Sequence, residues 1–269
     1  MFRINLYLQI DKFLKGLFSF YKTNYLCDCS KILKKQSKKK NIFFTSQCRI
    51  AFLYILKFLK IINPKKKEIV FVAYNLPEMV NVAKNLNYKI KYCDIDIKTG
   101  FYNFKNLKKI ISNKTQAIVL TNMFNNYQDS IKLKNLAKKN RITIIEDNAI
   151  YFDNYFKTKT GKKFTGSIGD FSIYSFNIMK NISALYGGAV VSNNKQFNKF
   201  ISNENKKLNK FPRSKILVQT FIFFILKIMS VKILYNNFFL HVIKQVHKND
   251  VWFVLKLFYT SLKFKIINF

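Results

Sequence analysis

Residues 68–95 have the sequence EIVFVAYNLPEMVNVAKNLNYKIKYCDI. The apolar run at 68–74 predicts a strand, residues 78–88 predict a helix, and residues 89–95 predict a second strand. Strands buried on both faces are short, continuous apolar runs, and a helix between two such strands is the unit of a parallel sheet. This stretch therefore predicts an α/β fold.

The same alternation of helix and strand continues on both sides of this stretch. Helices are predicted for SQCRIAFLYILKFLK (46–60), FKNLKKIIS (104–112) and DSIKLKNLAKKN (129–140), and strands for AIVLTNM (117–123) and RITIIED (141–147). Four consecutive helix–strand units predict an α/β domain with a mostly parallel central sheet flanked by helices.

Changes in composition divide the chain into three predicted parts. Residues 1–44 have a helical pattern and end in the basic run KILKKQSKKK (31–40), which predicts a solvated linker. Residues 45–210 form the predicted α/β domain, and residues 211–269 form a predicted apolar helical segment. Nearly half of the 269 residues are apolar (49%), which is enough for a sizeable core.

The formal net charge of +35 has two interpretations. It can mark a protein that binds nucleic acid or a membrane surface. It can also reflect coding bias, because Lys, Asn, Ile and Phe are all abundant. The basic residues are spread along the chain and form no nucleic-acid-binding motif, which favours coding bias. We therefore expect no nucleic-acid binding, although the charge favours anionic ligands.

The cysteines predict neither a metal site nor a disulfide framework. Only Cys27 and Cys29 are close in the sequence, and no second Cys/His pair follows them at zinc-ligand spacing. The N-terminal stretch MFRINLYLQIDKFLKGLF carries charges within its apolar run and lacks a small-residue cleavage site. These features predict a reduced, cytoplasmic protein without a signal peptide.

Glycine is concentrated in one short region. The chain has only seven glycines, and five of them lie within residues 161–188. Glycine permits positive φ angles and close approach of a ligand to the backbone, so the cluster indicates a binding site. Ordinary hairpin turns are the alternative explanation.

Three residues near this cluster are candidates for chemistry. Glu146 and Asp147 end the apolar strand ITII, and ligands of open α/β sheets bind at the carboxyl ends of strands. From position alone, a carboxylate there is equally well explained as a helix N-cap or as a ligand-binding group. Lys180 is enclosed by the glycines and follows the apolar strand FSIYSF, although taken alone it is most simply a surface charge.

A longer motif contains all three of these residues. IIEDNAIYFDN (144–154) is followed by GKKFTGSIGDFSIYSFNIMKNISALYGGAVVSN (161–193). It resembles the core of the DegT/StrS (DegT/DnrJ/EryC/StrS) sugar aminotransferases, which runs Glu-Asp-x-Ala, Gly-x-x-x-Gly-Ser-x-Gly-Asp, Ser-Phe-x-x-x-Lys and Gly-Gly-Ala-Val-Val. The stretch TSQCRIAFLYILKFL (45–59) is similar to the phosphate-loop helix of that family. The resemblance covers roughly residues 45–200 and implies the large domain of a fold type I pyridoxal-phosphate (PLP) transferase.

The resemblance also implies roles for individual residues. Lys180 would hold PLP covalently and carry a proton. Asp147 would keep the pyridine nitrogen protonated, and Tyr74 would stack on the ring. The phosphate would be bound by Ser175 and by Cys48, Arg49 and Ile50 at the start of a helix.

The sequence departs from the family pattern at two places. Gln47 and Cys48 stand where the family often has Ser-Gly, and Arg49 offers a compensating charge there. Ile150 stands where many members have a polar residue. Family members that act as dehydratases have His in place of the lysine, so Lys180 favours transamination.

The activity implied by the resemblance is transfer of an amino group, with glutamate as donor, to a keto-sugar nucleotide. Such sugars feed amino-sugar or surface-polysaccharide biosynthesis. Related enzymes are homodimers, and the apolar stretches at 1–20 and 213–245 are candidates for the interface. The alternatives are a degenerate, non-catalytic member that acts as a regulator or scaffold, and a basic membrane-surface protein.

The resemblance ends near residue 205. Family members are longer and finish with a small α/β domain, so the chain is expected to be truncated, with poor cofactor binding and slow turnover. The alternative is a replacement segment that contacts a membrane surface peripherally through 213–245. Its uninterrupted apolar run, 216–226, is too short to span a bilayer. In either case we expect 211–269 to form helices with an exposed apolar surface.

Overall fold

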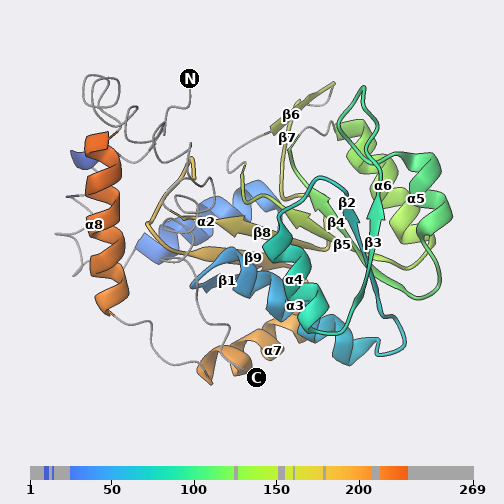
Figure 1. The fold of residues 1–269 in the computed structure, drawn as a ribbon, viewed down its shortest axis with the longest axis horizontal. Coiled ribbons are helices and arrows are strands. Elements are labelled where there is room, and N and C mark those ends of the chain that lie inside the picture. Colours follow the sequence, from blue (N-terminus) through green and yellow to red (C-terminus); the bar gives the residue numbers. More distant parts are fainter. Residues whose placement is uncertain are drawn as a thin grey trace, which may run out of the picture. The chain divides into compact units, whose positions relative to one another are not determined.

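The computed structural model describes residues 9–11, 14, 25–123, 127–150, 155–159, 161–177, 180–207 and 213–229. The chain divides into two compact units. One is Tyr7–Ile216, and the other combines Met1–Leu6 with Leu217–Phe269. The sheet and helices α2 to α7 all belong to the first unit (Figure 1).

The described strands and helices alternate along most of the first unit. The strands are β1 (Asn41–Thr45), β2 (Glu68–Val72), β3 (Lys89–Cys93), β4 (Thr115–Thr121), β5 (Thr143–Asp147), β6 (Tyr155–Thr158), β7 (Gly161–Phe164), β8 (Phe171–Ser175) and β9 (Gly188–Ser192). The helices are α2 (Tyr25–Ser37), α3 (Cys48–Ile62), α4 (Pro77–Asn85), α5 (Phe104–Ile110), α6 (Tyr127–Lys139), α7 (Lys195–Lys206) and α8 (Arg213–Met229).

Seven strands form one sheet in the order β1-β9-β8-β5-β4-β2-β3. β3, β2, β4, β5 and β8 are mutually parallel, and β9 runs antiparallel to both β8 and β1. β1 therefore runs in the same direction as the five parallel strands. β6 and β7 form a separate hairpin. The prediction of an α/β fold with a mostly parallel sheet is confirmed.

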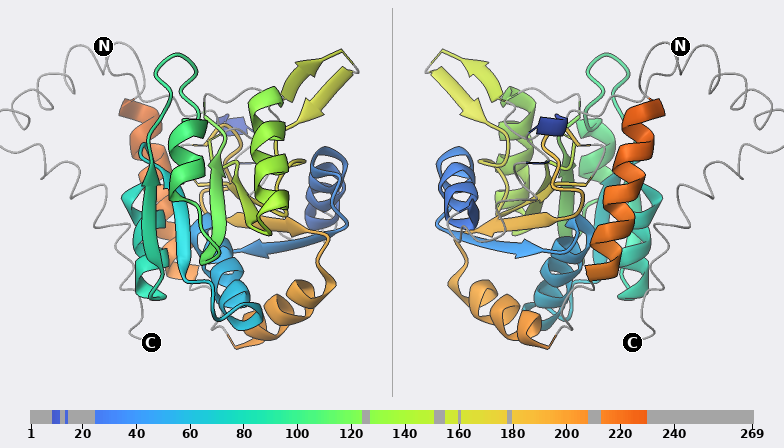
Figure 2. Two further views of the ribbon diagram at one scale, coloured as in Figure 1. Left: turned by 90° about the vertical axis from the view of Figure 1, so that its right-hand side faces the viewer. Right: turned by 90° about the vertical axis from the view of Figure 1, so that its left-hand side faces the viewer.

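Helices cover both faces of the sheet. α3, α4 and α7 pack on one face, where Phe52, Phe71 and Ile145 belong to one apolar cluster (Figure 2). α5 and α6 pack on the other face over a second cluster that includes Val70 and Ile144. Alternate residues of one strand thus serve opposite clusters, as the two-residue period of a strand requires.

α3 is the central helix of the first face. Its apolar residues recur at helical spacing, and eight of its fifteen residues are buried, among them Phe52, Ile55 and Leu59. Burying one such side chain contributes about 1.5–3 kcal/mol. The helix follows β1 after only two residues, so it begins at the carboxyl end of that strand.

The basic run at 31–40 differs from the solvated linker that the sequence predicts. Helix α2 extends to Ser37, and the Lys39 side chain is buried. β1 begins at Asn41 and pairs with β9 in register, Asn41 opposite Ser192. The sheet therefore starts before residue 45. The division of the chain into three domains remains a prediction.

The described part of the C-terminal segment is helix α8. Its exposed large apolar residues fall on one face of the helix: Leu217, Val218, Phe221, Ile225 and Ile228. The prediction of a helical C-terminal segment is confirmed for 213–229, and residues 230–269 lie outside the described residues. Among the helices described, none has the length and apolar character needed to cross a membrane.

Candidate active site

Three predicted positions meet on the α3 face of the sheet at the carboxyl edge. Ile145, Ile173 and Val190 belong to the cluster that packs on α3. Two positions away on each of these strands, at the carboxyl edge, are Asp147, Ser175 and Gly188. Because strand side chains alternate between faces, these three residues lie on the same face as the cluster. Gly188 is opposite Ser175, and Asp147 is opposite Ile173 on the neighbouring strand.

The N-terminus of α3 lies against the start of β9. Gln47, the N-cap residue, forms a bridge with Gly187. A Cβ atom on Gly188 would lie 2.4 Å from the backbone nitrogen of Cys48, so only glycine fits without displacing the helix. The first-turn N–H groups of a helix have no acceptor within the helix and favour anions. This edge of the sheet therefore presents donors beside Asp147 and Ser175.

Lys180 lies in the loop between β8 and β9. Its backbone nitrogen donates to Asn177 O (2.9 Å), and its side chain is half-buried. Burial raises the pKa of Asp147, while the Ala149 N–H and the positive charge of Lys180 act in the opposite direction. Burial also raises the pKa of the Cys48 thiol, again opposed by the charge of Lys180. The three side chains therefore share one electrostatic environment.

Glu146 points to the opposite face from Asp147 and serves the fold. Its Oε1 accepts hydrogen bonds from Asn122 Nδ2 (2.8 Å) and Gly166 N (2.6 Å). Its Oε2 accepts from Ile168 N (2.9 Å) and Gly169 N (2.8 Å), and the Ser172 hydroxyl lies 3.4 Å away. The side chain is fully buried. The structure thus gives the two neighbouring carboxylates different surroundings, which position in the sequence could not distinguish.

Lys39, two residues before β1, contacts the residues that bind Glu146. Its Nζ donates to Gly166 O and to Ser172 Oγ (2.8 Å), and both residues contact Glu146. We call the set Lys39, Asn122, Glu146, Gly166, Ile168, Gly169 and Ser172 the Glu146 clamp. No signal in the sequence distinguishes Lys39 from the other basic residues, and the clamp becomes visible only in the fold.

The stability of the protein should depend on the protonation of Lys39. Burial lowers the pKa of Lys39 to about 8, with the Glu146 charge opposing the shift. In the unfolded chain this amine titrates near 10.4, as an ordinary lysine does. Between these values the unfolded state binds more protons, so the contribution of Lys39 to the free energy of unfolding should rise with pH from about 8 to 10.5.

This contribution should amount to about 3 kcal/mol over that pH range. Urea denaturation at pH 7.5 and pH 10 would measure it in the wild type and in Lys39→Met. The variant should lack this contribution, whereas Lys40→Met, at an exposed neighbour, should keep it. An equal rise in Lys39→Met would contradict the assignment.

The five clustered glycines have three different functions. Gly161 has a φ of +100° and lies at the turn of the β6–β7 hairpin, with open space around its Cα. Gly166 and Gly169 allow the loop before β8 to wrap around Glu146, because a Cβ on Gly169 would lie 2.8 Å from the Glu146 Cβ. Gly187 and Gly188 adjoin the start of α3. Only the last pair adjoins the candidate site.

The other predicted site residues lie at the same edge. Ser175 ends β8, and Arg49 and Ile50 belong to the first turn of α3; all three are half-buried. Tyr74 follows β2 and is 64% exposed. Their roles toward a cofactor remain predictions.

Gln47 is a feature of the site that the sequence did not single out as a ligand. The residue is buried, with 8% of its surface exposed, and its Nε2 has no hydrogen-bond partner among the residues that the structure describes. Its side chain does not cap α3. A buried N–H without an acceptor costs about 1–3 kcal/mol. The N-terminus of α3 therefore contains a donor that an incoming acceptor could satisfy.

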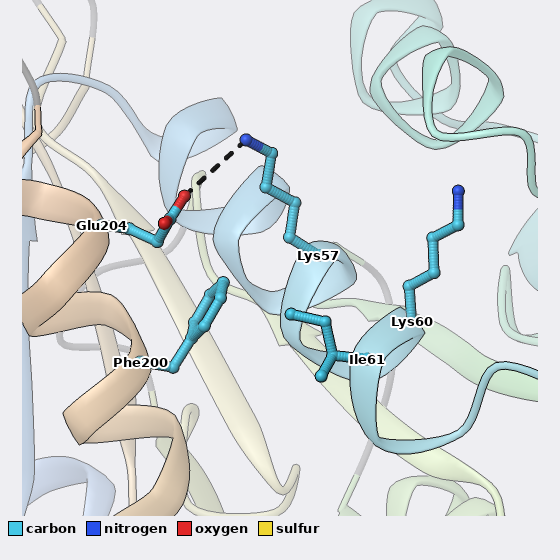
Figure 3. A pocket seen from close by; sticks show the side chains of 5 residues that line it. All are labelled: Lys57, Lys60, Ile61, Phe200 and Glu204. Atoms are coloured by element: carbon cyan, nitrogen blue, oxygen red, sulfur yellow. Dashed lines mark ion pairs between the residues drawn. The ribbon is translucent and has the colours of Figure 1, made fainter.

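Neither metal ligation nor the surface pocket competes with this site. The described residues contain no group of three or more His, Cys, Asp or Glu side chains able to hold a metal ion. A pocket of about 370 Å³ lies between α3 and α7, lined by Lys57, Lys60, Ile61, Phe200 and Glu204 (Figure 3). Its α3 residues start nine positions after Cys48, roughly 13 Å along the helix axis. The pocket is therefore separate from the carboxyl edge.

Comparison with known proteins identifies related sequences. The family model described as "DegT/DnrJ/EryC1/StrS aminotransferase family" matches residues 29–209. UDP-4-amino-4,6-dideoxy-N-acetyl-beta-L-altrosamine transaminase of Campylobacter jejuni is 32% identical over 134 residues, which cover 49% of this chain and 35% of that protein. GDP-perosamine synthase of Escherichia coli O157:H7 is 32% identical over 116 residues, covering 43% and 31%. The chain thus spans about a third of the length of these relatives.

Solved structures of low sequence identity share the fold. The Helicobacter pylori aminotransferase PseC, involved in the biosynthesis of pseudoaminic acid, has a TM-score of 0.63 at 19% identity. The match covers 79% of this chain and 58% of that one. Escherichia coli GDP-4-keto-6-deoxy-D-mannose-3-dehydratase with bound hydrated PLP has a TM-score of 0.62 at 19% identity, covering 75% and 54%. The same fold thus occurs in an aminotransferase and in a dehydratase.

Proposed function

Because the chain belongs to the DegT/DnrJ/EryC1/StrS aminotransferase family, we propose that it binds PLP and transfers an amino group to a nucleotide-linked keto sugar. One observation carries the proposal. Asp147, Ser175 and the N-terminus of α3 lie at one edge of the sheet, and Lys180 belongs to the adjoining loop between β8 and β9. An amine, a buried carboxylate and an anion-binding helix end are the groups that PLP requires.

The residues present fit the cofactor. The first turn of α3 supplies N–H donors for the phosphate, and Gly188 lets β9 pack directly against that turn, where a Cβ would collide with Cys48. The unpaired Gln47 Nε2 offers a further donor in place of the hydroxyl that the family often has. The Gln47-Cys48 pair therefore need not prevent phosphate binding, although it lacks the glycine of the family pattern.

Two side chains would handle protons and charge. When bound, PLP supplies a conjugated ring that withdraws electrons from the carbon bearing the amino group. The Asp147 carboxylate would accept a hydrogen bond from the protonated pyridine nitrogen, and this positive partner would offset the cost of its burial. The Lys180 amine would hold the cofactor and then carry a proton to and from the substrate carbon.

The substrate class follows from the relatives. The Campylobacter jejuni relative is a transaminase of a UDP-linked amino sugar, and the Escherichia coli relative forms GDP-perosamine. The chain also resembles a GDP-4-keto-6-deoxy-D-mannose 3-dehydratase, at 24% identity over 132 residues. Lys180 favours transamination over dehydration. A glutamate donor, a place in amino-sugar or surface-polysaccharide synthesis, and a cytoplasmic location remain predictions.

An apolar rim supports the proposal of a homodimer. Six exposed large apolar residues follow the carboxyl ends of β2, β3, β5 and β8: Tyr74, Leu76, Ile95, Ile97, Ile150 and Ile182. Exposed apolar side chains of this size often lie at interfaces, and Ile150 and Ile182 are close in the sequence to Asp147 and Lys180. Of the segments first expected at the interface, 1–20 lies largely outside the described residues, and the described part of 213–245 is helix α8.

PLP uptake tests the function. Adding PLP to the purified chain should produce a visible absorbance band that differs from that of the free cofactor. Glutamate should then bleach the band, and a nucleotide-linked keto sugar should restore it. Absence of any band would overturn the proposal and favour the non-catalytic regulator or scaffold.

A pair of glycine variants controls this experiment. Gly188→Ala should weaken PLP binding about tenfold or more, because overpacking at Cys48 costs about 1–3 kcal/mol. Gly161→Ala has open space for its methyl group, and the backbone strain at its φ of +100° is confined to the hairpin turn, so PLP binding should be unchanged. Equal affinities for the two variants would contradict the phosphate assignment. Peripheral membrane contact through 213–245 is tested separately, by flotation with anionic vesicles.

A further inference from the structure

The side chains of Glu146 and Asn148, on either side of Asp147, are both bound by Asn122. Asn122 Nδ2 donates to Glu146 Oε1 (2.8 Å) and to Asn148 Oδ1 (2.5 Å), so the residues on both sides of Asp147 are bound to one side chain. Asp147 lies between them and points to the other face, where its Oδ1 accepts from Ala149 N (2.9 Å). The direction of the Asp147 carboxylate therefore depends on how firmly Glu146 and Asn148 are held.

Lys39 contacts two of the residues that bind Glu146. Its Nζ donates hydrogen bonds to Gly166 O and Ser172 Oγ. Gly166 N in turn donates to Glu146 Oε1, and the Ser172 hydroxyl lies 2.7 Å from Gly166 O. Gly166 and Ser172 are 127 and 133 residues from Lys39 in the sequence. One buried amine thus joins the chain before β1 to the loop that surrounds Glu146.

We propose that Lys39 is a positioning residue for Asp147. Its hydrogen bonds to Gly166 and Ser172 hold the Glu146 clamp in place. The clamp in turn fixes the end of β5, from which the Asp147 carboxylate would face the cofactor. The proposal rests on the proposed function. It also means that the site depends on a residue outside the predicted 45–210 domain. Lys39 acts only through other groups and touches no reacting atom.

A double-mutant cycle on PLP affinity tests the proposal. Lys39→Met should weaken PLP binding about tenfold in the wild-type background, measured where both proteins are fully folded. In the Asp147→Asn background the same change should alter affinity less than twofold, because the carboxylate it positions is gone. Equal factors in the two backgrounds, or no effect in either, would overturn the proposal. Lys40→Met, at an exposed side chain, is the matched control.

Two further measurements keep the test decisive. If Lys39→Met does not fold, Ser172→Ala takes its place in the cycle, since it removes the hydroxyl that Lys39 contacts. If the wild type takes up no PLP, the proposed function fails, and amide exchange then decides the role of Lys39. Lys39→Met should speed exchange of the Ala149 N–H, which reports on Asp147, about tenfold. Unchanged exchange at Ala149 would overturn the proposal independently of the cofactor.

Discussion

Lys180→Ala should abolish the visible absorbance band that PLP gives with the wild-type chain. The amine is the group that would bond the cofactor, and Lys180 lies within electrostatic reach of both Asp147 and Cys48. Any remaining transamination should fall by about 10²–10⁴-fold from the lost proton carrier alone. Absorbance titration and single-turnover assays with glutamate measure the two effects.

Chemical labelling identifies the lysine directly. Borohydride reduction of the loaded protein, followed by peptide mapping, should place a single pyridoxyl group on Lys180. Lys98→Ala is a suitable control, because Lys98 is exposed near the same edge of the sheet. Lys39 is a second informative control, since burial lowers its pKa to about 8 and makes it more readily deprotonated than other lysines. A pyridoxyl group on Lys39 or any other lysine would refute the assignment.

The sequence predicted the central part of the fold because its strands are buried on both faces. β2 and β4 are continuous apolar runs, and their type is clear from composition alone. β1 was missed for the opposite reason. Its five residues are only half-buried, and they directly follow a basic run that resembles a linker. Its apolar run, Ile42 to Phe44, is only three residues long, although the strand pairs along its full length with β9.

The candidate site was predictable only in part. Asp147 and Lys180 came from a motif, and in the structure Asp147 ends β5 while Lys180 lies in the loop between β8 and β9. The sequence could not separate Glu146 from Asp147, because neighbouring strand residues point to opposite faces and only the packed helices reveal which face carries the site. Lys39 and the unpaired Gln47 amide could not be found at all. Their importance comes from contacts across more than a hundred residues or from a missing partner.

The same pair of carboxylates gives the sharpest stability test. Glu146→Gln should destabilise the fold by about 3–5 kcal/mol, because each unsatisfied buried donor costs about 1–3 kcal/mol. Both oxygens of Glu146 accept at least two donors, so either orientation of the new amide sets its NH2 against two of them. Such a loss is a large share of the 5–15 kcal/mol typical of a folded domain.

Asp147→Asn should leave the stability of the fold nearly unchanged but weaken PLP binding. Burial raises the pKa of Asp147, so the ionised carboxylate is costly there, and an asparagine oxygen can still accept from Ala149 N. Its unfolding free energy should change by less than about 1 kcal/mol, while PLP affinity falls tenfold or more, as expected for losing a hydrogen bond to a charged group. Urea denaturation and PLP titration of both variants measure this contrast. A large loss of stability in Asp147→Asn, or an unchanged fold in Glu146→Gln, would mean that the two carboxylates have been assigned to the wrong faces of the sheet.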